Sequence, residues 1–319
     1  MLTEPNVNKS QLKEILEKEY DFSIDEIAFN PKGYASWSYI IQTNKGKFFL
    51  KLYKPENFDQ KVFDFTADLY SKCHIENIVH PIKTKNNEIY FSFDNFKLVL
   101  FNFIDGQTSK EQPLNNNQLE ELGELFANIH KSHEIIGPYE VREKFEFPFK
   151  EGILKIYENI DSLNNLNEIK QQARQVYIKY KENFLNELSQ LERLAEKLKS
   201  ENIEFVNCHG EPSPDNIIVS TEGKTYLIDW DFPIFAPKEK DLAFFDDRYD
   251  PILAGYRKQF PNAEINKEVR KYYGLLWNVQ EIEDWGKRLL LESQSEEENK
   301  NNYAELLNFL NYSGLKYET

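Results

Sequence analysis

One short segment of the chain holds both an acid and an amide that are suited to phosphoryl transfer. It reads His209-Gly210-Glu211-Pro212-Ser213-Pro214-Asp215-Asn216, and a later apolar run ends at Asp229. Phosphoryl transfer requires a carboxylate near the acceptor hydroxyl and two oxygen ligands for Mg²⁺, all in fixed positions. The pattern therefore indicates Glu211 as the base or orienter of the hydroxyl, with Asn216 and Asp229 as the metal ligands.

A β-hairpin must bring these side chains together. Residues Asn216–Ser220 and Lys224–Asp229 are rich in strand-forming types, and the turn Thr221-Glu222-Gly223 separates them. Two such runs around a glycine-containing turn predict a hairpin. This hairpin would return Asp229 to the side of Asn216.

The N-terminal third of the chain predicts a mostly antiparallel sheet with helices. Leu12, Ile15 and Leu16 have helical spacing, and Ser10 is a plausible helix cap. A second helix is expected over Asp59–Lys72. Four strands are expected, at Tyr39–Thr43, Lys47–Tyr53, Glu88–Phe93 and Lys97–Ile104. The turn Asn44-Lys45-Gly46 joins the first two.

After Asp105-Gly106 the pattern becomes predominantly helical. Apolar faces of helical period run through Leu119–Ile129, through one long helix over Tyr177–Leu198, and again between Lys267 and Leu310. We therefore expect an α+β, two-lobed chain. Residues 1–104 would form the N-terminal lobe, and residues 105–319 the helical C-terminal lobe.

The catalytic segment resembles that of the aminoglycoside phosphotransferase family, which has a protein-kinase-like fold. In that family the loop reads His-Gly-Asp, four residues and Asn, so Glu211 departs from the pattern. Trp230-Asp231-Phe232-Pro233 and Ala236-Pro237-Lys238-Glu239-Lys240-Asp241-Leu242 resemble the spectinomycin phosphotransferase branch most closely. The resemblance implies an N-terminal nucleotide-binding lobe and a cytoplasmic kinase that uses ATP or GTP with Mg²⁺.

The resemblance also assigns nucleotide contacts in the N-terminal lobe. Lys51 matches the lysine that holds the α- and β-phosphates. Asp64 is the best-spaced acid to orient it, with Asp68 or Glu56 as alternatives. Ser36, in the glycine-poor loop Gly33–Ser38, is a candidate phosphate donor. The segment from Phe101 through Phe103 to Gly106 is similar to the linker whose backbone reads the base. Each feature has a purely structural alternative: an exposed strand lysine, an ordinary turn or a strand end.

The substrate is expected to be a small hydroxylated molecule. The resemblance to the spectinomycin branch and the net charge of −15 favour a cationic aminocyclitol or aminoglycoside. Candidate contacts are Asp231, Tyr273, Trp277 and Glu281, and for Trp277 plain helix packing is the stronger alternative. Other kinases of this fold act on choline, homoserine or sugars, so a metabolite kinase stays open. A nucleotide-binding pseudokinase is the second alternative, because Glu211 breaks the family pattern.

Composition narrows the possible binding partners and the cellular location. The excess of 54 Asp and Glu over 39 Lys and Arg disfavours binding to nucleic acid or anionic membranes. The two cysteines, Cys73 and Cys208, suit a reducing compartment, and the N-terminus shows no secretory pattern, so the cytoplasm is expected. The sequence fixes neither the oligomeric state nor a role in antibiotic resistance as opposed to metabolism.

Overall fold

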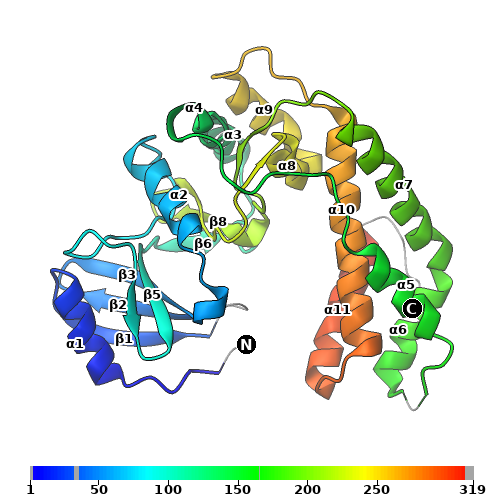
Figure 1. The fold of residues 1–319 in the computed structure, drawn as a ribbon, viewed down its shortest axis with the longest axis horizontal. Helices are drawn as coiled ribbons and strands as arrows, with labels where there is room; N and C mark the ends of the chain where they lie inside the picture. Colours follow the sequence, from blue (N-terminus) through cyan, green and yellow to red (C-terminus); the bar gives the residue numbers. More distant parts are fainter. Residues whose placement is uncertain (1–2, 32–35, 165, 313–319) are drawn as a thin grey trace. The chain divides into compact units, whose positions relative to one another are not determined.

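The chain divides into two compact units. The computed structural model describes residues 3–31, 36–164 and 166–312 (Figure 1). Unit 1 comprises Met1–Arg142 and Phe205–Ala263, and unit 2 comprises Glu143–Glu204 and Glu264–Thr319. The boundary expected near residue 104 falls inside unit 1, so the division into lobes at that point stays a prediction.

A five-stranded antiparallel sheet forms the first part of unit 1. Its order is β1-β2-β3-β5-β4, and its strands are β1 (Ile24–Asn30), β2 (Trp37–Thr43), β3 (Gly46–Tyr53), β4 (Phe91–Phe93) and β5 (Phe96–Asn102). The pairing of Thr43 with Gly46 closes the expected β2–β3 hairpin. Strands β4 and β5 are also where the sequence predicted them, although β4 is shorter than expected, whereas β1 was not predicted.

Helices α1 (Lys9–Glu19) and α2 (Gln60–Ser71) pack on this sheet. Leu12 and Leu16 of α1 share a core with Leu50 and Leu52 of β3. Because side chains alternate along a strand, Lys51 and Tyr53 point to the opposite face, where α2 contributes Phe63 against Tyr53. The predicted cap of α1 was wrong by two residues: the side chain of Asn8, not Ser10, accepts the backbone N–H groups of the first turn.

The rest of unit 1 holds two small sheets and a pair of packed helices. The elements are β6 (Gly106–Thr108), α3 (Asn116–Lys131), α4 (His133–Ile136), β7 (Val206–Cys208), β8 (Ile217–Ser220), β9 (Thr225–Leu227), β10 (Ile234–Ala236), α8 (Glu239–Leu242) and α9 (Tyr249–Arg257), with 3₁₀ segments at Pro55–Asn57, Pro214–Asn216 and Ala243–Arg248. One sheet has the order β6-β8-β9, and the other pairs β10 with β7. Helix α9 lies so close to α3 that a Cβ on Gly255 would come within 1.9 Å of the Glu120 carbonyl oxygen.

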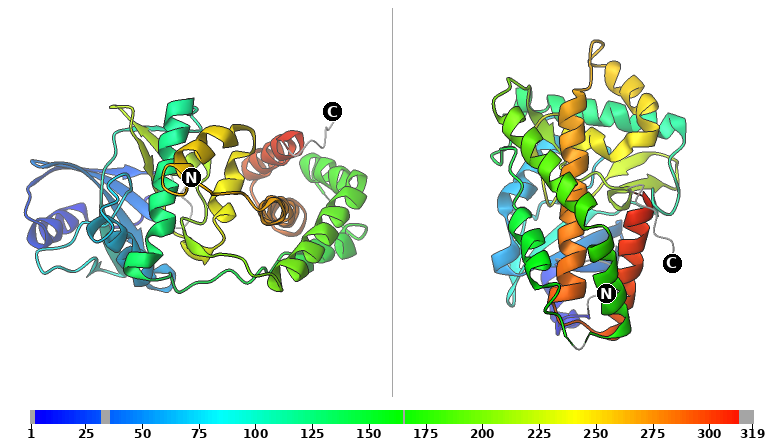
Figure 2. Two further views of the ribbon diagram at one scale, coloured as in Figure 1. Left: turned by 90° about the horizontal axis from the view of Figure 1, so that it is seen from above. Right: turned by 90° about the vertical axis from the view of Figure 1, so that its right-hand side faces the viewer.

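Unit 2 is helical. Its elements are α5 (Lys150–Asn159), α6 (Glu168–Lys179), α7 (Lys181–Lys199), α10 (Lys267–Gly286), a π-helical turn (Lys287–Leu291) and α11 (Glu296–Tyr312). Figure 2 shows α10, in orange, running alongside the green helices and α11. The long amphipathic helix expected over Tyr177–Leu198 is confirmed from Lys181 onward as α7, whereas a turn at Tyr180 places Tyr177 in α6. That turn leaves the Tyr180 ring buried beside Phe184.

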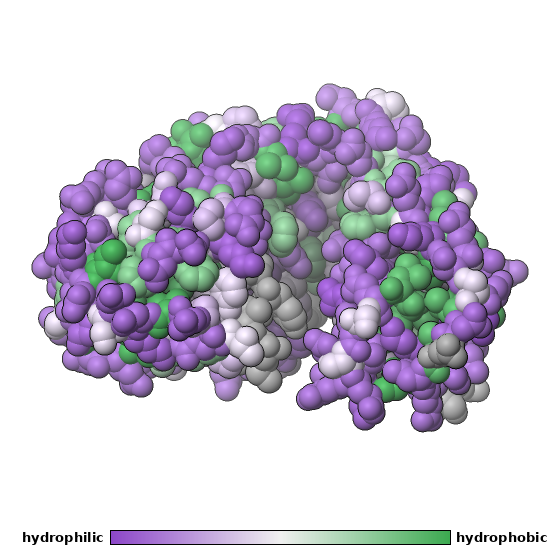
Figure 3. All heavy atoms as spheres, turned by 60° about the horizontal axis from the view of Figure 1, so that its bottom comes forward, coloured by the Kyte–Doolittle hydropathy of each residue, from purple (hydrophilic) through white to green (hydrophobic). Residues whose placement is uncertain are grey.

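One face of the molecule can be judged for polarity in Figure 3. On the face drawn in Figure 3, hydrophilic residues predominate and apolar residues gather only in small patches. None of the described helices combines the length and apolar character needed to cross a bilayer.

Candidate active site

The loop between β7 and β8 has a defined hydrogen-bonded shape. The side-chain amide N–H of Asn216 donates to the carbonyl of Glu211 at 2.9 Å, and the backbone N–H of Ser213 donates to the same carbonyl at 2.8 Å. Pro214 begins the 3₁₀ turn that ends at Asn216, where its fixed φ suits a first helical position. The Asn216 amide is therefore oriented by its nitrogen, and no described residue donates a hydrogen bond to its oxygen.

The β8–β9 hairpin brings Asp229 to this loop, as the sequence predicted. Ile217 pairs with Leu227, and the backbone N–H of Ile228 donates to the carbonyl of Asn216 at 3.0 Å. Asp229 follows with a φ of 60°, in the left-handed region that few residues other than glycine adopt. This conformation turns the chain sharply just after the strand.

Lys51 of β3 meets Asp229. Its Nζ lies 2.6 Å from Asp229 Oδ1, and the lysine side chain is only 17% exposed. The carboxyl group of Asp231 contacts that of Asp229. Burial would raise the pKa of Asp229, but the Lys51 ammonium holds it below its ordinary value. For Asp231, burial and the neighbouring Asp229 raise the pKa against the opposing effect of Lys51.

Glu211 is half-buried beside these charges. Burial raises the pKa of its carboxyl group, Lys240 lowers it, and Asp229 and Asp231 raise it again, with a net upward shift. Asp215, the other carboxylate of the loop, is 60% exposed and pairs with Lys110 at 3.0 Å. Of the two, Glu211 therefore has the surroundings of a base.

A buried carboxylate braces the catalytic loop from behind. Asp241 of α8 accepts the backbone N–H of His209 at 2.9 Å and that of Gly210 at 2.8 Å. Gly210 has a φ of +94°, and a Cβ there would lie 2.0 Å from the Phe232 carbonyl oxygen, so only glycine fits. Asp241 lies within α8, which begins at Glu239, so it acts as a brace for the loop and not as a helix cap.

His130 and Tyr256 support Asp241 in turn. His130 Nε2 lies 3.0 Å from Asp241 Oδ2, and His130 Nδ1 lies 3.0 Å from the Tyr256 hydroxyl. All three side chains are almost fully buried. Burial raises the pKa of Asp241, yet the hydrogen bonds from His130 and the loop backbone outweigh it and lower that pKa. Tyr256 carries no motif, and sequence reasoning missed it.

The structure does not bring Asp64 to Lys51. Asp64 is exposed on α2, and no described hydrogen bond or ion pair joins it to the lysine. The buried face of α2 carries apolar residues such as Phe63, so the acid expected to orient Lys51 lies on the wrong side of the helix. Its place beside the lysine is taken by Asp229.

The other nucleotide candidates lie around the same sheet. Ser36 is buried at the start of β2, whereas residues 33–35 of the predicted phosphate loop lie outside the described residues. Phe101 is buried in β5 with its ring 6.0 Å from that of Phe63, and Phe103 follows the end of the strand with Lys47 over its ring. Their contact with a nucleotide stays a prediction.

The substrate candidates fall into both units. Asp231 lies in unit 1 with the predicted metal ligands, whereas Tyr273, Trp277 and Glu281 lie on α10 in unit 2. Tyr273 is buried and donates to the Glu143 carboxylate at 2.9 Å. Trp277 is 36% exposed and packs edge-on against Phe309. Contacts within unit 2 thus account in part for the placement of Tyr273 and Trp277. The role of these residues in substrate binding stays a prediction.

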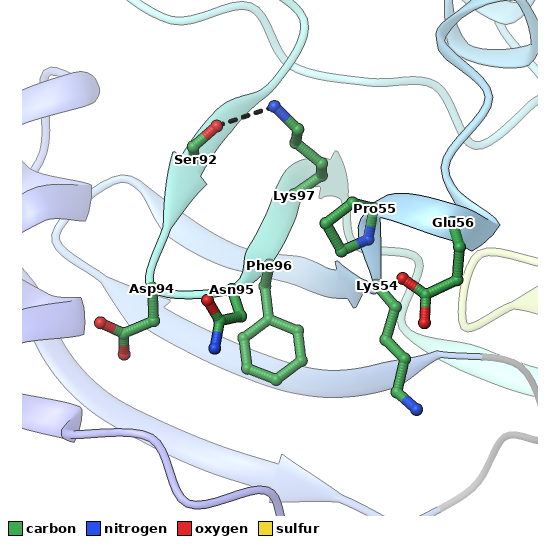
Figure 4. Close-up of a pocket in the computed structure, with 8 residues that line it drawn as sticks. All are labelled: Lys54, Pro55, Glu56, Ser92, Asp94, Asn95, Phe96 and Lys97. Atoms are coloured by element: carbon green, nitrogen blue, oxygen red, sulfur yellow. Dashed lines mark hydrogen bonds between the residues drawn. The ribbon is translucent and has the colours of Figure 1, made fainter.

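A pocket of about 530 Å³ lies away from these residues, beside the β4–β5 turn (Figure 4). Phe96 and Pro55 contribute apolar walls, and Lys97 is held by Ser92 at 2.9 Å. Charges of both signs line it, from Lys54 and Lys97 to Glu56 and Asp94. It contains none of the predicted site residues.

The chain is similar in sequence and in fold to known phosphotransferases. A sequence profile of the phosphotransferase enzyme family matches residues 26–272. No curated protein sequence is significantly similar to the chain.

Three solved structures illustrate the likeness in fold. A spectinomycin phosphotransferase in complex with ADP and spectinomycin is 22% identical, with a TM-score of 0.82 over 94% of this chain and 95% of that one. An aminoglycoside phosphotransferase from Alicyclobacillus acidocaldarius is 11% identical, with a TM-score of 0.66 over 98% and 95%. A choline kinase from Streptococcus pneumoniae is 16% identical, with a TM-score of 0.58 over 95% and 99%. The expected α+β, protein-kinase-like fold is confirmed.

Proposed function

Because the chain belongs to the phosphotransferase enzyme family, we propose that it transfers the γ-phosphate of ATP to a hydroxyl group of a small cationic substrate of the aminocyclitol or aminoglycoside kind. That it is a small-molecule phosphotransferase follows from the family itself. The proposal concerns the substrate, the metal and the residues. The observation that carries it is the cluster of Lys51, Asp229, Asn216 and Glu211 at one place in unit 1.

The residues present fit a Mg²⁺ ion. Mg²⁺ takes hard oxygen ligands, commonly one or two carboxylates together with phosphate oxygens. Asp229 supplies a carboxylate, and the Asn216 amide is fixed through its nitrogen so that its oxygen is available. When bound, the ion would neutralise charge on the transferred phosphate.

The protein's own groups have distinct roles in this proposal. Glu211 accepts the proton of the substrate hydroxyl, and its raised pKa brings it closer to neutral pH, where a general base is most effective. Lys51 holds the α- and β-phosphates. Asp241 fixes the loop through two backbone N–H groups, so that Glu211 is held in position without a contact of its own to the brace.

Two observations support a cationic substrate: the net charge of the protein and its similarity to kinases of known structure. The net charge of −15 attracts cations, and the similar structures include enzymes whose names refer to spectinomycin, aminoglycosides, choline and aminopropanol. A choline-like or amino-alcohol metabolite is therefore the second candidate. Neutral sugars have no comparable support.

A substrate panel tests the proposal directly. ADP release would be measured with spectinomycin, several aminoglycosides, choline, amino alcohols, homoserine and neutral sugars, each with ATP and with GTP. We expect turnover with a cationic acceptor and, by mass spectrometry, a product heavier by one phosphoryl group. Turnover restricted to neutral sugars would refute the substrate class. ATP binding without turnover on any acceptor would favour a pseudokinase.

A further inference from the structure

Among the described residues Lys51 has a single ion-pair partner, and that partner has another task in the proposed function. Its ammonium bonds to Asp229, the residue proposed to bind Mg²⁺. The acids of α2 offer no substitute: Asp68 pairs with Lys72 at 2.8 Å, and Asp64 is exposed. When Asp229 turns toward a metal ion, Lys51 needs a second group that holds it in place, because a buried ammonium without a partner is costly.

Tyr53 is the residue whose position meets this need. It stands two positions after Lys51 on β3, so both side chains leave the same face of the strand. The tyrosine is 5% exposed, and its ring packs at 5.3 Å from that of Phe63 and 6.0 Å from that of Phe58. These contacts fix the ring and therefore the place of its hydroxyl.

The Tyr53 hydroxyl is buried and makes no hydrogen bond of ordinary geometry to a described residue, but Lys51 lies close enough to interact with it. Its nearest charges are those of the site: Lys51, Asp231 and Asp229 all act on its ionisation. Burial raises the pKa of Tyr53 above its ordinary value, against the effect of Lys51, so the phenol stays neutral. A neutral phenol accepts one hydrogen bond while donating another.

We propose that Tyr53 is a positioning residue for Lys51: its hydroxyl oxygen accepts a hydrogen bond from the lysine ammonium when Asp229 binds the metal ion. This inference rests on the proposed function of Lys51 and Asp229. The Tyr53 phenol thus takes the lysine-orienting role that the sequence led us to expect from an acid on α2. Because it is neutral, the full charge of Lys51 remains directed at the nucleotide phosphates. The phenolic proton is free to point to Asp231, which lies in the same cluster.

The substitution Tyr53→Phe tests this role, because it removes the hydroxyl and keeps the ring. ADP affinity would be measured by calorimetry with and without Mg²⁺. Without the metal, Lys51 keeps Asp229, and we expect affinities within about twofold of the parent. With Mg²⁺ we expect roughly tenfold weaker binding or more, as for the loss of a hydrogen bond to a charged group. With a cationic acceptor, kcat should fall as well.

Tyr20→Phe is the matched control. Tyr20 is also buried, also has a hydroxyl without a hydrogen-bond partner among the described residues, and lies in the core formed with α1. Both variants should unfold close to the parent's temperature, since each keeps its buried ring and loses only a hydroxyl without a hydrogen bond of ordinary geometry. The Tyr20 variant should bind ADP normally in both conditions.

Two results would overturn the inference. Unchanged ADP affinity of Tyr53→Phe with Mg²⁺ means that the hydroxyl does not position Lys51. A loss of equal size with and without Mg²⁺ means that Tyr53 acts only through packing. Lys51→Ala separates these results from failure of the proposed function: if that variant binds Mg²⁺ and ADP normally, the phosphate-binding role of Lys51 itself is wrong.

Discussion

The Nζ of Lys51 lies 2.6 Å from the Oδ1 of Asp229, and this ion pair joins strand β3 to the end of the β8–β9 hairpin. Two segments that are far apart in the sequence thereby place a cation and a carboxylate at one point. The proposed function requires both there, because Lys51 would bind the nucleotide phosphates and Asp229 the metal ion that these phosphates carry.

Asp229→Ala should abolish the metal dependence of nucleotide binding. The parent should bind ATP much more tightly with Mg²⁺, whereas the variant should bind it about equally weakly with and without the ion. Calorimetry in both conditions measures the difference. Asp215→Ala is the control, because Asp215 belongs to the same loop but is exposed and pairs with Lys110. Parent protein that binds ATP equally well in both conditions would contradict the metal assignment.

The buried brace predicts a graded loss of stability. Tyr256→Phe leaves His130 Nδ1 without its partner and should cost about 1–3 kcal/mol, the usual range for a buried unsatisfied group. Asp241→Asn replaces a carboxylate oxygen with a donor that faces backbone N–H groups, and should cost about 3–5 kcal/mol. Chemical denaturation measures both. Equal and small losses would mean that the brace does not depend on its charge.

The same carboxylate predicts how stability varies with pH. The pKa of Asp241 is lowered in the folded protein, so its contribution is complete above the ordinary aspartate value of about 3.9 and is lost as pH falls through the lower folded value. The penalty of Asp241→Asn should therefore be larger at pH 7 than near pH 3. Denaturation of parent and variant at both values measures the difference. A penalty independent of pH would show that the carboxylate is not ionised in the native state.

Local patterns in the sequence predicted much of the fold and the catalytic loop. The β2–β3 hairpin followed from its turn, and the meeting of Asn216 with Asp229 followed from the β8–β9 hairpin, because both depend on short-range geometry. The partner of Lys51 did not follow. The packing of Phe63 against the sheet determines which side of α2 is buried, and Asp64 lies on the side exposed to solvent. Sequence spacing alone does not show which side of a helix a neighbouring sheet covers.

Long-range packing explains the other differences. Tyr180 continues the apolar period of its neighbours, yet the chain turns there and buries the ring beside Phe184. Tyr256 supports His130 from more than a hundred residues away in sequence, which no local pattern indicates. For Tyr53 a signal existed: it stands two positions after Lys51 in a strand, so the two had to share a face.

Salt should weaken substrate binding more than nucleotide binding. If the substrate is cationic, the negative field of the protein raises its local concentration, and an exposed field is screened within about 10 Å at 0.1 M ionic strength. The KM for the acceptor should rise with added KCl, while the KM for ATP changes less. Steady-state kinetics over a salt series gives both values. An acceptor KM that does not respond to salt would instead favour a neutral substrate.

Glu211 offers the sharpest test of catalysis, because the family pattern has aspartate at its position. Its carboxylate extends one methylene further, roughly 1.5 Å, and misplacement by about 1 Å can cost a hundredfold in rate. The loop that presents it is held by Pro214, by the Asn216 side chain and by Asp241 behind it, and a loop held in this way would not readily move to compensate for a shorter side chain. Glu211→Asp should therefore be less active than the parent rather than improved.

Glu211→Gln should lower kcat by about 10²-fold or more, since proton acceptance by a positioned base contributes 10²–10⁴. Nucleotide affinity should stay within about twofold, because glutamine keeps the size of the side chain and Glu211 is not a proposed ligand of the metal or the phosphates. Asp215→Asn, a change of the same kind in the same loop, should leave kcat unaltered. Single-turnover rates and calorimetry on the three proteins separate chemistry from binding. Parent-like turnover by Glu211→Gln would exclude Glu211 as the base, and a loss in Asp215→Asn would transfer the role to Asp215.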